Sequence, residues 1–171
     1  MKQPEYIFSK KKILIYGLGK SGVSSFKFLK DKAELYLFDD KKKMNLNLKK
    51  RCITLSEISK IKFDKIIISP GIDISNCKLS KFLKNNLSKI YTDLDVFYSF
   101  YCKNESIAIT GTNGKSTTAK ILHDILLGQN IDVRLVGNIG NPALNERKIT
   151  KKTVFVICLL YTSPSPRDTN E

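Results

Sequence analysis

Short apolar runs alternate with segments of helical spacing along the first half of the chain. The runs Lys12–Tyr16, Glu34–Phe38 and Asp64–Ser69 have the pattern of strands that are buried on both faces. Helical spacing of apolar residues follows at Val23–Lys30 and again at Leu79–Leu87. Strands that alternate with helices in this way predict a parallel sheet with right-handed crossovers.

The same alternation continues in the second half. Asp93–Tyr101 is predicted to be an amphipathic helix with Asp93 as its N-cap. Its aromatic residues Tyr98, Phe100 and Tyr101 are predicted to make contacts between domains. The remaining pattern predicts four strands and one long helix: strands at Lys89–Thr92, Ile107–Ile109, Asp132–Val136 and Thr153–Ile157, and a helix at Lys115–Leu127.

Composition narrows the class of protein. The 171 residues are 42% hydrophobic and 27% charged, as in an ordinary globular protein. No apolar run reaches the length of a bilayer span and the N-terminus lacks the apolar core of a secretion signal, so we expect a cytoplasmic protein without membrane insertion. The four cysteines show no C-x-x-C spacing, which favours reduced thiols over disulfides or a zinc site.

The net charge of +14, from 30 basic and 16 acidic residues, suggests a nucleic-acid partner. The lysines, however, are spread over predicted helix faces and turns, without interleaved aromatic residues or a groove-reading motif. We therefore interpret them as a solvated basic surface and expect no nucleic-acid partner.

The first strand runs directly into a glycine-rich turn. Gly17–Gly22 (GLGKSG) has the G-x-G-x-x-G pattern between a strand and a helix, which is the context that this motif requires. Asp39 ends the next strand, 17 residues after Gly22, where a dinucleotide-binding fold has the acid that holds a ribose. The turn predicts binding of a nucleotide or its diphosphate without identifying the nucleotide.

A second glycine-bearing loop lies at Thr110–Thr117 (TGTNGKST). Its glycines allow backbone N–H groups to turn inward, Lys115 can reach the outer phosphates, and the Ser116 hydroxyl can ligate Mg²⁺. The positive end of the following helix points at the same place. The general P-loop pattern would have glycine where Ile109 stands, so this is a shorter variant of that loop.

With both loops placed, the chain resembles the Mur ligases, ATP-dependent amide-forming enzymes of peptidoglycan assembly. The loop TGTNGKST looks like the variant that replaces the ordinary P-loop in that family, and GNIGNPAL at Gly137–Leu144 looks like the segment that follows the next strand. In the first half, GLGKSG, the FDD strand end and SPGI at Ser69–Ile72 resemble the members that add D-glutamate to UDP-N-acetylmuramoyl-L-alanine. The resemblance covers about residues 10 to 157.

The resemblance implies a fold, a reaction and a set of site residues. The fold is a Rossmann-like domain over residues 1–92 that binds the UDP substrate, followed over 93–157 by the beginning of a P-loop-type ATP-binding α/β domain. The reaction transfers a phosphoryl group from ATP to the alanyl carboxylate, and the amine of D-glutamate attacks the acyl phosphate. We expect ATP and Mg²⁺ as cofactors and a monomeric protein.

By this implication Lys115 is catalytic, on the outer phosphates, and Ser116 is the metal ligand. The residues expected to bind ATP are Gly111, Thr112, Asn113, Gly114, Lys115, Ser116 and Thr117. The residues expected to bind the UDP substrate are Leu18, Gly19, Lys20, Ser21, Gly22, Asp39, Asp40, Lys41, Gly71 and Asn138.

The end of the chain departs from the family pattern. The family carries a glutamate as a second Mg²⁺ ligand after the Thr153–Ile157 strand, whereas here Cys158 stands there, and a thiol is a poor ligand for a hard cation. The run TSPSPRD resembles a recurring artefactual ending, so we expect 158–171 to be a non-native tail. Since the rest of the ATP domain and the amino-acid-binding domain are also absent, we expect no ligase activity from this polypeptide.

Two other functions remain open from the residues alone. A nicotinamide-dependent oxidoreductase would use Gly17–Gly22 and Asp39, but it does not explain the loop Gly111–Thr117. A basic nucleic-acid-binding module would explain the charge, but neither glycine-bearing loop.

Overall fold

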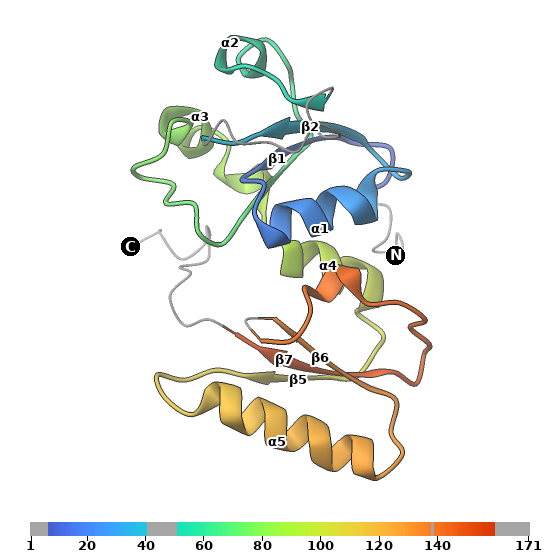
Figure 1. Ribbon diagram of the computed structural model, residues 1–171. Helices are drawn as coiled ribbons and strands as arrows, with labels where there is room; N and C mark the ends of the chain where they lie inside the picture. Colours follow the sequence, from blue (N-terminus) through green and yellow to red (C-terminus); the bar gives the residue numbers. More distant parts are fainter. Residues whose placement is uncertain (1–6, 41–50, 138, 160–171) are drawn as a thin grey trace.

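The computed structural model describes residues 7–40, 51–137 and 139–159, and the predicted site residues Lys41 and Asn138 lie outside these ranges. The described chain forms two parallel sheets stacked with helices between them (Figure 1). The α/β class and the parallel sheets predicted from the sequence are confirmed. The described residues contain no helix long and apolar enough to cross a membrane.

The first sheet has four parallel strands in the order β2-β1-β3-β4. In the central register Ile15 lies opposite Leu37 on one side and Ile67 on the other. The helical segments of this half are short except for α1. The elements are β1 (Lys12–Tyr16), α1 (Lys20–Leu29), β2 (Glu34–Phe38), α2 (Leu55–Ile58), β3 (Lys65–Ile68), α3 (Ser80–Lys84), η3 (Leu87–Lys89) and β4 (Ile90–Tyr91).

Both faces of this sheet are buried, which explains the continuous apolar runs of its strands. Because successive side chains of a strand point to opposite faces, Ile13 and Ile15 pack on the side of α1. Leu14 and Tyr16 pack on the other side, in a cluster with Ile58 of α2 and other apolar residues.

The second sheet has three parallel strands in the order β5-β7-β6. Its long helix covers one face, where Ala119 packs with Val156 and Cys158. The side chains of Phe155 and Ile157 point to the opposite face. The elements are β5 (Ser106–Ile109), α5 (Lys115–Gly128), β6 (Val133–Gly137), η4 (Ala143–Asn145) and β7 (Val154–Cys158).

The last strand extends one residue further than the sequence pattern predicted. Cys158 is the final residue of β7, is 1% exposed and pairs with Ile109 and Gly137. The next residue, Leu159, still donates its backbone N–H to the Ile109 carbonyl at 2.9 Å. The remainder of the predicted non-native tail, 160–171, lies outside the described residues.

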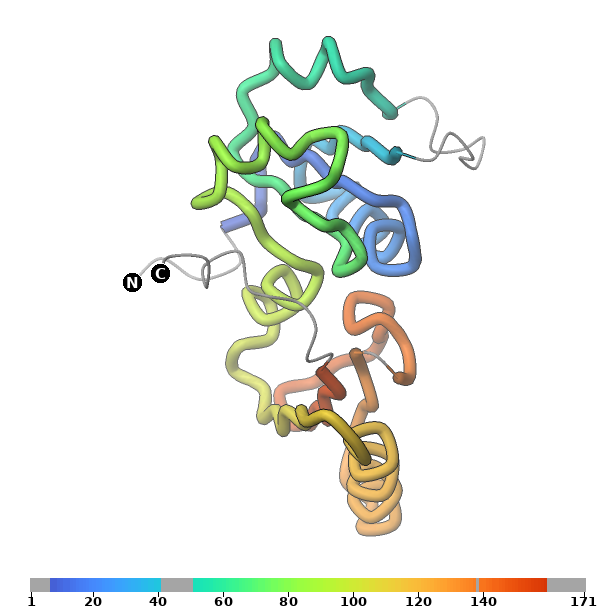
Figure 2. The backbone as a smooth tube through the Cα atoms, turned by 90° about the vertical axis from the view of Figure 1, so that its left-hand side faces the viewer, coloured from blue at the N-terminus to red at the C-terminus, as the bar shows by residue number. Residues whose placement is uncertain are grey.

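Helix α4 (Asp93–Tyr101) lies between α1 and the second sheet (Figures 1 and 2). The prediction of Asp93 as its N-cap was wrong, because Thr92 occupies that position. The Thr92 hydroxyl accepts a hydrogen bond from the Asp95 backbone N–H, and the Asp95 carboxylate accepts one from the Thr92 N–H at 2.7 Å. This reciprocal pair is a capping box, which leaves Asp93 as the first helical residue.

Helix α4 joins the two sheets through aromatic packing. Phe97 meets Phe155 of β7 edge to face, with ring centroids 4.7 Å apart, and Phe100 meets Phe28 of α1 in the same manner at 4.9 Å. Tyr101 also packs on this cluster, whereas Tyr98 is 58% exposed. The predicted contacts of these aromatic residues between domains stay a prediction. The apolar core is therefore continuous from one sheet to the other, while the predicted boundary at residues 92 and 93 stays a prediction.

Replacing Phe97 should destabilise the protein much more than replacing its neighbour on α4. Phe97→Ala removes a ring that is 1% exposed and leaves a cavity, so we expect the free energy of unfolding to fall by about 3–5 kcal/mol. Tyr98→Ala truncates a mostly exposed ring and should change it by no more than about 0.5 kcal/mol. Urea denaturation of both variants measures the difference, and equal losses would contradict this account of α4.

Candidate functional site

Three loops meet at the carboxyl edge of the first sheet, around the predicted glycine turn. Gly17 has a φ of +90° and donates its N–H to the Phe38 carbonyl at 2.9 Å. Ser69, directly after β3, donates its hydroxyl to the Gly17 carbonyl at 2.8 Å. The ends of β1, β2 and β3 are thereby tied together, as is usual at a ligand-binding edge of a parallel sheet.

The other two glycines of the motif have different surroundings. A Cβ on Gly22 would lie 1.8 Å from the Gly17 carbonyl oxygen, so this position is filled by close packing of α1 against the turn. A Cβ on Gly19 would meet nothing within 4 Å, and the residue is exposed as the N-cap of α1. Gly22 is thus needed for packing, and Gly19 leaves backbone that a phosphate can approach.

Asp39 bonds the glycine turn, and Asp40 bonds the end of the strand before it. The Leu18 backbone N–H donates to Asp39 Oδ2 at 2.5 Å, so part of the carboxylate that the sequence predicted for a ribose is bonded to the turn itself. Tyr16 donates its hydroxyl to Asp40 Oδ2 at 2.8 Å. Burial, together with this bond, raises the pKa of Tyr16, so the phenol stays protonated as a donor. Sequence reasoning missed this role because Tyr16 reads simply as the end of an apolar run.

Asp93 is a second residue that sequence reasoning placed differently. It is 9% exposed, and burial raises the pKa of its carboxyl group, while a hydrogen bond with Ser21 acts in the opposite direction. Ser21 belongs to the glycine turn, so Asp93 connects that turn to α4. The predicted residues Lys20 and Gly71 are exposed near the same edge, in the first turn of α1 and after β3.

The second predicted loop connects β5 to α5 with two glycines in left-handed conformations. Gly111 has a φ of +143° and Gly114, the N-cap of α5, a φ of +74°. Thr112, Asn113 and Thr117 are exposed. The Lys115 ammonium lies 3.5 Å from the Thr112 carbonyl oxygen, so its side chain folds back over the loop.

Helices α1 and α5 begin without a side-chain cap. Helices α2 and α4, in contrast, each begin with a capping box that satisfies their first N–H groups. The uncapped N–H groups of α1 and α5 are therefore available to an external acceptor, and the positive end of the helix dipole favours an anionic one.

Cys158 lies next to the proposed metal ligand. Its Sγ atom is 3.9 Å from Ser116 Oγ, because β7 ends beside the first turn of α5. Within residues 7–40, 51–137 and 139–159, no group of three or more His, Cys, Asp or Glu side chains could hold a metal ion. The Ser116 hydroxyl suits Mg²⁺, whereas the neighbouring thiol does not, since Mg²⁺ prefers oxygen ligands.

A pocket of about 450 Å³ lies between α4 and the open face of the second sheet. Its lining is mainly apolar and includes Phe97, Tyr98, Ala108 and Ile157. None of the predicted site residues lines it, and its lining residues include Asp95 but no lysine or arginine to pair with a phosphate. The pocket is therefore not a candidate nucleotide site.

Comparisons with known proteins support the family resemblance. Residues 11–90 match the family model described as "Mur ligase MurD-like, N-terminal domain". The chain is 35% identical over 145 residues to the UDP-N-acetylmuramoylalanine--D-glutamate ligase of Rickettsia felis, covering 81% of this chain and 32% of that protein. The same enzyme of Rickettsia prowazekii is 36% identical over 82% of this chain and 32% of its own length.

A more distant organism gives the same result. The enzyme of that name from Caldicellulosiruptor saccharolyticus is 31% identical over 160 residues, covering 86% of this chain and 35% of its own. The chain thus spans about a third of the length of the curated relatives that it matches.

The two glycines of the first turn should respond differently to alanine. Gly22→Ala forces a methyl group into the Gly17 carbonyl, so we expect the free energy of unfolding to fall by about 2 kcal/mol or more. Gly19→Ala meets no atoms and should cost no more than about 1 kcal/mol, the usual loss at an N-cap. Thermal or urea denaturation checks the pair, and a stable Gly22→Ala variant would refute the packing role.

Proposed function

Because this chain belongs to the MurD-like Mur ligases, we propose that it is part of an ATP-dependent, ADP-forming ligase that joins D-glutamate to UDP-N-acetylmuramoyl-L-alanine in peptidoglycan synthesis. The observation that carries this proposal is the loop Gly111–Thr117, which enters α5 through a left-handed Gly114. An oxidoreductase would leave this loop unexplained, and the relatives described above are all ligases.

The first glycine turn is the proposed site for the UDP part of the substrate. Its backbone is exposed at Gly19 and Lys20, and α1 presents uncapped N–H groups there. A diphosphate carries the negative charge that such a helix end favours. Leu18, Gly19, Lys20, Ser21 and Gly22 would hold the diphosphate and ribose, with Asp39, Asp40, Lys41, Gly71 and Asn138 completing the set.

The loop after β5 is the proposed ATP site. Phosphoryl transfer to a carboxylate brings two anions together, so the catalyst must neutralise charge on the transferring group. Lys115 and the N–H groups of the loop would bind the phosphates, and Ser116 would help to hold the Mg²⁺ that comes with ATP. The metal would supply further charge neutralisation.

Cys158 limits what this chain can do with bound ATP. It stands beside Ser116, where a second oxygen ligand would complete the metal site. We therefore propose that the chain binds its two nucleotides without turning them over. We also propose that it acts in the cytoplasm, where ATP and the UDP-sugar are available, as a monomer.

Binding of the UDP substrate should depend on the exposed backbone at Gly19. We expect UDP-N-acetylmuramoyl-L-alanine to bind the wild type, and Gly19→Ala to weaken it by at least about tenfold because the added methyl group stands where the diphosphate approaches. Isothermal titration calorimetry measures this, with NAD as the competing ligand. Binding of NAD in preference to the UDP substrate would support the oxidoreductase instead.

Binding of ATP–Mg²⁺ should depend on Lys115. We expect Lys115→Ala to lower the affinity by about tenfold to a hundredfold, the usual loss for a charge-assisted hydrogen bond. Lys120→Ala is the matched control, since Lys120 lies on the same helix and pairs with Asp124 at the surface. In the presence of the UDP substrate and D-glutamate, ADP release should stay at background, and substrate-dependent release would show that Cys158 is tolerated.

A further inference from the structure

The segment that follows β6 folds back over the end of its own strand. Gly140 has a φ of +82°, and a Cβ there would lie 2.2 Å from the Leu135 carbonyl oxygen. The next residue, Asn141, forms a parallel bridge with Val136, the residue after Leu135. Gly137 is equally crowded, because its Cβ would lie 2.3 Å from the Cys158 carbonyl oxygen. We call residues 139–141 the return; they belong to the run GNIGNPAL at Gly137–Leu144.

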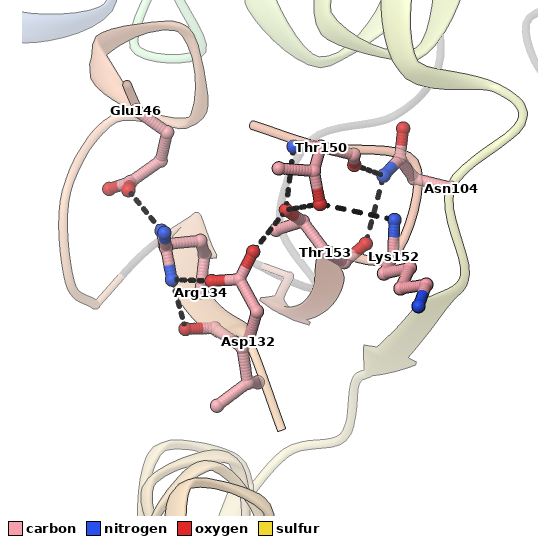
Figure 3. Close-up of polar contacts among 8 residues, drawn as sticks. Asn104, Asp132, Arg134, Glu146, Thr150, Lys152 and Thr153 are labelled. Atoms are coloured by element: carbon pink, nitrogen blue, oxygen red, sulfur yellow. Dashed lines mark hydrogen bonds and ion pairs between the residues drawn. The ribbon is translucent and has the colours of Figure 1, made fainter. Parts of the chain in front are cut away.

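A single carboxylate holds the return in place. Glu146 Oε1 accepts a hydrogen bond from the Asn141 side-chain amide at 3.1 Å. Its other oxygen, Oε2, lies 3.4 Å from Nε of Arg134 on β6 (Figure 3). The Glu146 side chain is 10% exposed and that of Arg134 is 28% exposed, so the pair is shielded from the water that weakens most surface ion pairs.

Arg134 is itself anchored at the start of the second sheet. Its NH1 group lies 2.5 Å from Asp132 Oδ1, and Thr153 donates its hydroxyl to the other oxygen of Asp132 at 2.5 Å (Figure 3). The bond from Thr153 and the charge of Arg134 lower the pKa of Asp132, so this carboxyl group is ionised at neutral pH. Asn104 bonds the carbonyls of Thr150 and Thr153, which fixes the other end of this network.

The far end of the return is fixed to the first half of the chain. Ala143 and Leu144 of η4 are each 2% exposed and belong to the core that α1 and α4 share. Ser24 of α1 donates its hydroxyl to Asn145 Oδ1 at 2.9 Å. Since α1 begins in the glycine turn, η4 connects the second sheet directly to the helix of the proposed UDP-substrate site.

We propose that Glu146, paired with Arg134, is a positioning residue for the UDP-substrate site. It holds Asn141 and the return after β6 in one conformation, and through η4 it holds that return against α1. Arg134 pairs with both Asp132 and Glu146, so its removal would leave Glu146 as a shielded carboxylate without its cationic partner. This inference rests on the proposed function, because it assumes that the ligand of α1 is the UDP substrate.

The test compares the affinities for UDP-N-acetylmuramoyl-L-alanine and for ATP–Mg²⁺ in the full 171-residue chain. We expect Glu146→Ala to lower the affinity for the UDP substrate by about tenfold and the affinity for ATP–Mg²⁺ by less than about twofold. Glu146→Gln keeps an acceptor for Asn141, so its loss should be no more than about threefold. Glu105→Gln removes an exposed carboxylate from the same half and should change neither affinity.

A double-mutant cycle separates positioning from general stability. Arg134→Met leaves Glu146 uncompensated and should lower the affinity for the UDP substrate more than Glu146→Gln does. Adding Glu146→Gln to Arg134→Met should restore part of the lost affinity. Equal losses of affinity for both ligands, or losses of affinity that are additive in the double-mutant cycle, would show a merely structural role and overturn the proposal. An unchanged affinity in a folded Glu146→Ala variant would do the same.

Titration of the wild type distinguishes failure of the proposed function from failure of the positioning role of Glu146. If the wild type does not bind the UDP substrate, the proposed function fails and this inference fails with it. If the wild type binds and Glu146→Ala binds equally well, the function stands and only the positioning role is refuted. Should Glu146→Ala fail to fold, Glu146→Gln and Arg134→Met carry the same comparison.

Discussion

Burial of one helix between two sheets is the contact on which the rest of the structure depends. Val96 and Phe97 of α4 are almost completely buried, and the core around them takes side chains from both sheets. Hydrophobic burial by itself has no direction, but the edge-to-face contact of Phe97 with Phe155 restricts how the helix can sit on β7. The two glycine turns therefore have a defined relation to each other before any ligand binds.

The helices differ in how their first N–H groups are satisfied: α2 and α4 have side-chain caps, whereas α1 and α5 do not. Thr54 and Thr92 complete capping boxes at α2 and α4, which serve packing. The helices that follow the two glycine turns begin instead at Gly19 and Gly114, which have no side chain to offer. The first N–H groups are thus satisfied by side chains at α2 and α4 and are left for an anion at α1 and α5. The five-residue helix α3 also begins without a side-chain cap, so the glycine turn before the helix is what distinguishes α1 and α5.

The strands and both glycine loops could be predicted from the sequence because each depends on neighbouring residues. Apolar runs such as Lys12–Tyr16 identify buried strands, and glycines at a strand–helix junction identify the turns. The contacts that the sequence did not reveal join distant residues: Tyr16 with Asp40, Ser21 with Asp93, and Ser24 with Asn145, 121 positions later. The N-cap of α4 was misassigned for a different reason, since Thr92 and Asp93 are both good caps and only the reciprocal bond to Asp95 decides between them.

The strand order of the second sheet has a consequence for how this chain folds. Among the residues that the structure describes, β5 pairs with β7 alone, and in that pairing Ser106 lies opposite Phe155, although β6 comes earlier in the sequence. During synthesis, β7 leaves the ribosome only after almost all of the described second half has been made. Strand β5, which precedes the phosphate loop, therefore cannot form this pairing earlier. Pairings of such high sequence separation form slowly, and unpaired strand edges are prone to aggregate meanwhile. The proposed ATP loop, the most recognisable segment in the sequence, therefore follows a strand whose described partner, β7, is synthesised last of the described strands.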